Sequence, residues 1–118
     1  MVEDRFLQQL KKGVLEMLVL ELICVRPTYG YELISTLRTR SDALFTLKEG
    51  TLYPILYRLE DEGLIVSRWQ QGNGRVTPKK VYAATAAGAQ ECERRYEIWE
   101  TFSKTIEVFF AGRNQDAT

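Results

Sequence analysis

Histidine is absent from this sequence of 118 residues, and cysteine occurs only at Cys24 and Cys92. The chain therefore lacks the commonest general base and the commonest metal ligand, and two cysteines alone cannot close a structural zinc site. It also lacks a nucleophile and base at a recognisable spacing and a glycine-rich phosphate loop. We expect no enzymatic activity, no metal and no cofactor. In a reducing cytosol the two cysteines are expected to be buried thiols, with a disulfide as the alternative.

Long hydrophobic runs are also missing. The longest one, residues 14–25, is interrupted by Glu16 and Glu21 and is shorter than the roughly 20 residues that span a bilayer. The first six residues contain two acids and no apolar segment of the kind found in signal peptides. We therefore expect a cytoplasmic protein.

Neither charge is in excess, because 16 basic residues balance 16 acidic ones. A net charge of zero at first argues against a nucleic-acid partner, but the charges are unevenly distributed. Residues 63–82 contain no acid, and acidic residues are concentrated on both sides of this segment. Its cations are Arg68, Arg75, Lys79 and Lys80. Such a patch suits contact with DNA through one face, and a solvated hairpin is the alternative.

Apolar residues recur at three- and four-residue spacing in the first half of the sequence, which predicts three helices. We expect them at residues 5–25, 29–40 and 49–62. Thr28 is the predicted cap of the second helix. The third begins either at a capping box of Thr46 and Glu49 or at Gly50. Pro54 favours the later start, because proline is tolerated best in the first helical turn.

The second half predicts a β-hairpin followed by one long helix. Strands are expected at residues 64–69 and 80–84, joined by a turn over residues 71–74 in which glycine and asparagine tolerate positive φ. Thr85 is a suitable N-cap for a helix over residues 86–111.

Three helices followed by a hairpin are typical of a winged helix-turn-helix. The predicted fold class is mainly α with a small β-hairpin, a winged helix-turn-helix plus a C-terminal dimerisation helix. We expect residues 1–85 to form the DNA-binding region. Residues 86–112 are expected to be the dimerisation helix of the same compact domain, and residues 113–118 a frayed tail.

Four short motifs carry a resemblance to a known family. Residues 29–33 read YGYEL, residues 50–60 read GTLYPILYRLE, and residues 63–65 read GLI. Residues 80–88 read KVYAATAAG. Together they resemble the PadR family of transcriptional regulators over residues 7–110. The resemblance implies a DNA-binding regulator, with repression as the expected activity and an inverted-repeat operator bound by a homodimer.

The third helix is by this resemblance the recognition helix, which presents its first residues to base edges in the major groove. Thr51 and Tyr53 are suitable side chains there, and Arg58 is expected to contact phosphate or to have a structural role. The alternative for Tyr53 and Tyr57 is half-buried packing. Tyr31 is expected to contact a backbone phosphate by resemblance, with packing against the third helix as the alternative.

The hairpin is the predicted wing, and its tip and returning strand supply further candidate DNA contacts. These are Asn73, Gly74, Arg75, Lys79 and Lys80. Phosphate contacts position a protein on DNA and make its affinity salt-dependent. We expect Trp69 to anchor the wing on the body of the domain rather than to stack on a base. A winged-helix protein-interaction module that does not bind DNA is the alternative function.

The last helix has more apolar surface than packing on one small domain requires. Its apolar side chains follow one another at three- and four-residue steps, so we expect this helix to join two copies of the chain. The predicted interface residues are Cys92, Tyr96, Trp99, Phe102, Ile106, Phe109 and Phe110.

The short segment after the last helix resembles the short-tailed branch of the PadR family, in which one helix dimerises. In multidrug-sensing members of this branch a tryptophan on that helix and its symmetry mate bind aromatic ligands. Trp99 is at the matching position, so the resemblance implies an aromatic small molecule that releases the DNA. Leu7, Leu10, Val14 and Ser103 complete the predicted site. The alternative is that Trp99 only fills a dry dimer core.

Overall fold

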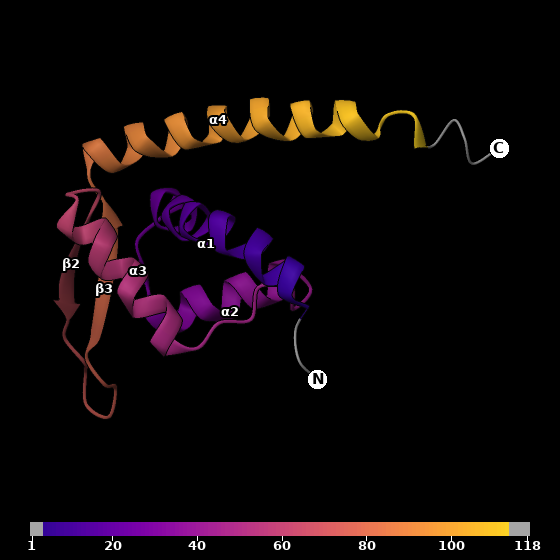
Figure 1. Cartoon of the computed structure of the whole chain (residues 1–118). Helices are drawn as coiled ribbons and strands as arrows, with labels where there is room; N and C mark the ends of the chain where they lie inside the picture. Colours follow the sequence, from indigo (N-terminus) through magenta and orange to yellow (C-terminus); the bar gives the residue numbers. More distant parts are fainter. Residues whose placement is uncertain (1–3, 114–118) are drawn as a thin grey trace.

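The computed structural model describes residues 4–113 and has four helices and three strands in that range (Figure 1). The helices are α1 (Arg5–Val25), α2 (Gly30–Arg40), α3 (Glu49–Asp61) and α4 (Ala86–Phe110). The strands are β1 (Thr28–Tyr29), β2 (Ile65–Gln70) and β3 (Lys79–Ala84). Every predicted element begins and ends within about one residue of its expected bounds, and the mainly helical fold class is confirmed. The expected frayed tail lies outside the described residues, apart from Arg113.

The sheet has three strands rather than the two of the predicted hairpin, in the antiparallel order β1-β3-β2. Thr28 and Tyr29 form the additional strand and pair with Tyr82 and Val81. The prediction that Thr28 caps the second helix is therefore wrong. Tyr29 is the N-cap of α2, and the Thr28 hydroxyl donates to the Glu32 carboxylate at 2.5 Å. A two-residue strand has no periodicity of its own and forms only because β3 lies beside it.

The start of α3 also differs from the predicted one. The helix begins at Glu49, and its N-cap, Lys48, makes no side-chain hydrogen bond. The predicted capping box is wrong, because the Thr46 hydroxyl donates to the Ala43 carbonyl at 2.8 Å. Pro54 consequently lies inside the helix and removes one hydrogen bond of its ladder.

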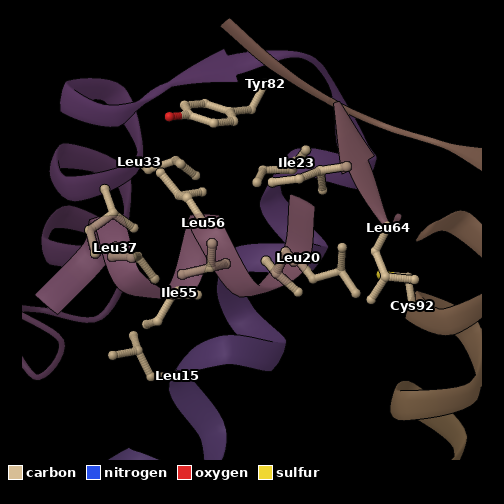
Figure 2. Packing of buried hydrophobic residues seen from close by; sticks show 14 residues of the cluster. Leu15, Leu20, Ile23, Leu33, Leu37, Ile55, Leu56, Leu64, Tyr82 and Cys92 are labelled. Atoms are coloured by element: carbon tan, nitrogen blue, oxygen red, sulfur yellow. The ribbon is translucent and has the colours of Figure 1, made fainter. Parts of the chain in front are cut away.

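One hydrophobic core lies between α1, α2, α3 and the sheet, and α4 adds a single buried thiol to it. Figure 2 shows Tyr82 lying over one side of the cluster near Leu33, while Cys92 reaches the cluster beside Leu64. Several core side chains have almost no exposed surface. They are Val19, Leu20, Ile23, Leu33, Leu52, Leu56, Leu59 and Ile65. Burial of aliphatic side chains on this scale is what holds α3 against the rest of the domain.

The start of α4 is attached to the junction between α3 and β2. The Thr85 amide donates to the Leu64 carbonyl at 3.0 Å, and the Thr85 hydroxyl donates to the Gly63 carbonyl at 2.7 Å. Gly63 has a φ of +76°, the left-handed conformation that commonly follows the last residues of a helix. Gly88 lies so close to Leu64 that a Cβ would be 1.9 Å from the carbonyl oxygen.

Beyond this attachment α4 runs across α1 and continues past the other helices (Figure 1). The molecule is consequently elongated, with extents of 63 × 37 × 21 Å.

We expect Gly88→Ala to destabilise the protein by roughly 2–4 kcal/mol, because the added methyl must push α4 away from the Leu64 carbonyl. Gly13→Ala is the matched control. A Cβ at Gly13 meets no atom within 4 Å, so this change should stabilise α1 by about 0.5–1 kcal/mol. Urea unfolding followed by circular dichroism measures both. Equal stability of Gly88→Ala and the wild type would contradict the described attachment.

Candidate nucleic-acid interface

α3 buries one face and exposes the other. Its buried residues are Leu52, Ile55, Leu56 and Leu59. Thr51 is exposed near the start of the helix, and Tyr57 is 70 % exposed one to two turns later. The exposed face of α3 therefore offers the hydroxyl, methyl and phenol groups that the sequence predicted for a recognition helix.

Tyr53 is both partly packed and partly accessible, so it fits half-buried packing as well as a contact with DNA. A Cβ on Gly30 would lie 2.8 Å from the Tyr53 hydroxyl oxygen, so the ring lies over the first residue of α2. The glycine of the YGYEL motif makes room for this approach. Tyr53 nevertheless remains 39 % exposed, so part of its ring stays accessible on the outer face of α3.

Two further candidates differ in how firmly the chain holds them. The Arg58 Nε atom donates to the Glu16 carboxylate at 3.2 Å, which ties α3 to α1 and favours a structural role for this guanidinium. Such a partly exposed pair stabilises only slightly but fixes the direction of the side chain. Tyr31 is 77 % exposed, so most of its ring is accessible to solvent.

The wing brings together the candidate cations of the sequence. Asn73, Gly74, Arg75 and Lys79 are exposed, and Lys80 is half-buried. The Lys79 ammonium lies 4.2 Å from the centroid of the Tyr29 ring, a cation–π contact. Within residues 4–113 the wing cations form no ion pair, so their charge is not neutralised by a neighbouring carboxylate.

The prediction that Trp69 anchors the wing is wrong, because Trp69 is 63 % exposed. Ser67 and Tyr82 attach the wing instead. The Ser67 hydroxyl donates to the Glu60 carboxylate of α3 at 2.7 Å. Tyr82 is buried in the core, and this burial raises the pKa of its phenol, with smaller contributions from Tyr53 and Glu60.

The two cysteines are free thiols. Cys92, which the sequence placed on the dimer surface, is instead buried in the core of its own chain, and its thiol donates to the Glu21 carboxylate at 2.8 Å. Burial is the main cause that raises the pKa of Cys92, and the bond to Glu21 adds to it. Cys24 is half-buried, and its thiol donates to the Gly88 carbonyl at 3.6 Å. Both thiols therefore serve the contact between α1 and α4.

Among the described residues, α4 carries eight of the 18 exposed large hydrophobic side chains, more than any other element. The other predicted interface residues all remain at least 38 % exposed: Tyr96, Trp99, Phe102, Ile106, Phe109 and Phe110. Val108, which the sequence reasoning missed, is 72 % exposed on the same segment. The rings of Trp99 and Phe102 pack with their centroids 6.3 Å apart.

A groove of about 460 Å³ lies between α1 and α4 beside Trp99. It brings Val14 together with Trp99, as predicted from the sequence. Its lining is Gly13, Val14, Glu16, Met17, Arg95, Ile98, Trp99 and Phe102. Leu7, Leu10 and Ser103 do not line it, and the Ser103 hydroxyl donates to the Glu100 carbonyl.

Arg95 was not predicted for this site. Its Nε atom donates to the Glu91 carboxylate at 2.7 Å, and it lines both this groove and a second hollow of about 450 Å³ between the same helices. The helical periodicity did not reveal Arg95, because it grouped only apolar residues.

Residues 19–94 match the profile of the "Transcriptional regulator PadR-like family". The chain belongs to this family. PadR-like regulators bind DNA, and neither the family nor the similar structures described next are enzymes. Within the described residues, no helix has both the length and the hydrophobicity required to cross a membrane. No cluster of three metal-ligating side chains occurs among them either.

Relatives of known sequence and structure agree with this membership. Uncharacterized protein X of Lysinibacillus sphaericus is 29 % identical over 104 residues, which cover 86 % of this chain and 92 % of that protein. Transcriptional regulator YqjI of Escherichia coli is 30 % identical over 100 residues, 85 % of this chain but only 46 % of YqjI. This chain thus spans less than half of that longer relative. A PadR family regulator from Eggerthella lenta has a similar structure, with a TM-score of 0.77, 30 % identity, and coverage of 89 % of this chain and 88 % of the other.

Proposed function

We propose that this PadR-like protein is a cytoplasmic repressor that binds an inverted-repeat operator as a homodimer. One observation supports the proposal: the exposed side of α3 that carries Tyr57 lies next to the wing, because Glu60, one turn further along the helix, accepts the Ser67 hydroxyl, and the wing has cations and no acids. A recognition helix flanked by unpaired cations suits major-groove entry with phosphate contacts beside it. A protein-interaction module would not require this separation of charge.

We expect the double change Lys79→Ala and Lys80→Ala to weaken binding to duplex DNA of any sequence. Each lost phosphate contact should lower the log–log slope of affinity against salt by about 0.9. The measurement is a fluorescence-anisotropy titration of the upstream DNA of its own gene and of a random duplex, at several salt concentrations.

Lys104→Ala is the matched control, because Lys104 is an exposed cation on the far half of α4. It should change neither affinity nor slope. A wild-type protein that does not bind either duplex at low salt would overturn the regulator proposal in favour of an interaction module.

The homodimer is proposed from the outer half of α4. Phe102, Ile106 and Phe109 remain exposed there although α1 covers the first half of the same helix. Apolar surface of this kind is stabilised by a partner, and a second copy with two-fold symmetry is the simplest one. Such symmetry would set two recognition helices against half-sites about one DNA turn, roughly 34–36 Å, apart.

We expect the wild type to sediment as a dimer at micromolar concentration and Ile106→Glu to sediment as a folded monomer, because the dimer would bury a carboxylate without a partner. Lys104→Glu introduces the same carboxylate two residues away and is the control for charge alone. A monomeric wild type in the analytical ultracentrifuge would refute the dimer.

Release of the operator by an aromatic small molecule is proposed for the groove beside Trp99. Its volume of about 460 Å³ is within the usual range for ligand sites, and Val14, Met17 and Ile98 give it apolar walls. A ligand bound between α1 and α4 would alter how two α4 helices pack and so the spacing of the recognition helices. The ligand can shift the equilibrium between the DNA-binding arrangement and the released arrangement of the dimer only if it binds one of the two more tightly.

In a Trp69→Phe background we expect planar aromatic dyes to quench the Trp99 emission saturably. Trp99→Ala should abolish dye binding while the protein stays dimeric, because the flat ring that stacks on the dye is gone. Emission that is unaffected by such dyes up to high micromolar concentration would instead assign Trp99 to a dry dimer core.

A further inference from the structure

Trp69 is a large aromatic side chain that the folded domain leaves without a packing role. It lies on β2 and is 63 % exposed, although tryptophan is highly buried on average. Nothing in the attachment of the wing depends on it, since Ser67 and Tyr82 make that contact. A large aromatic ring exposed on the wing is available to contact a partner, and its surroundings decide which partner suits it.

The register of the wing decides which way Trp69 points. Successive side chains of a strand alternate between the two faces, so Ser67 and Trp69 share one face of β2. Trp69 pairs with Lys80 and Ser67 pairs with Tyr82, and directly paired residues lie on the same face. Ser67 and Tyr82 face α3, as the hydrogen bond to Glu60 shows. Trp69 and Lys80 therefore continue the face that looks toward the recognition helix.

The positive charges around Trp69 favour an anionic partner. Lys80 is its cross-strand neighbour and Arg68 precedes it, and the wing from Ile65 to Ala84 contains no acid. A second copy of the wing would bring like charges together, which disfavours self-association through this surface. The DNA backbone offers the complementary chemistry, because its phosphates attract the cations while the apolar faces of its deoxyriboses suit an indole ring.

We propose that Trp69 packs against the sugars of the operator strand that borders the groove entered by α3, while Lys80 beside it contacts the adjoining phosphate. This inference rests on the proposed DNA-binding function and adds an apolar contact to the electrostatic ones. Trp69 then positions the wing along the DNA, and its contribution to affinity does not depend on salt.

The test compares Trp69→Ala, Trp69→Phe and Lys80→Ala with the wild type, using the same duplexes and salt series as above. Trp69→Ala should weaken binding roughly tenfold by loss of buried apolar area, with an unchanged salt slope because no charge is removed. Lys80→Ala should lower the slope by about 0.9. Trp69→Phe keeps a flat apolar ring and should recover most of the affinity.

Val66→Ala is the matched control, because Val66 lies on the same strand with 53 % exposure but on the opposite face. It should bind DNA like the wild type. Wild-type binding with no loss in Trp69→Ala overturns this inference alone, and so does a Trp69→Ala protein that loses dimerisation instead of affinity per dimer. Failure of the wild type to bind DNA overturns the proposed function and this inference together.

Discussion

The carbonyl of Leu64 accepts a hydrogen bond from the Thr85 amide and lies against the bare Cα of Gly88, so one backbone group determines where α4 leaves the sheet. The Thr85 hydroxyl reinforces this point by donating to the Gly63 carbonyl and accepting from the Gly88 amide. Gly63 also follows the end of α3, so α3, the wing and α4 meet within a few residues.

The wing and α4 leave this junction as two surfaces of different chemistry, although the net charge of the chain is zero. The wing keeps its cations free of carboxylates, whereas α4 carries five acids and three bases around its exposed apolar residues. Acidic residues outside the wing balance its positive charge, and within residues 4–113 none of them forms an ion pair with a wing cation. The net charge therefore gives no information about the binding partner. The positions of the charges on the surface do give such information.

The helices were predictable because their apolar spacing and their boundaries are local in sequence. Thr85, for example, caps α4 as predicted, and this signal acts within a single turn. The third strand and the contact of Cys92 with Glu21 of α1 were not predictable, since each depends on a neighbour more than 50 residues away. For the candidate site, the exposed residues of α3 and the wing cations were predicted correctly in position, but the exposure of Trp69 was not. The sequence favoured an anchor because tryptophan is usually buried, and the 63 % exposure of Trp69 in the folded chain shows that it is not one.

Exposed aromatic residues on the two surfaces have different electrostatic surroundings, and this difference limits which partner each surface accepts. Trp69 has Lys80 as its cross-strand neighbour, so an anionic partner gains from both the ring and the charge. Phe102 and Phe109 lie on a helix with a net acidic charge, where an anionic polymer would be repelled. A helix of this kind can still meet its own copy, because apolar burial at the seam outweighs weak repulsion between carboxylates that remain in water. Charge would thus separate the proposed self-association from the proposed DNA contact, although each surface exposes aromatic side chains.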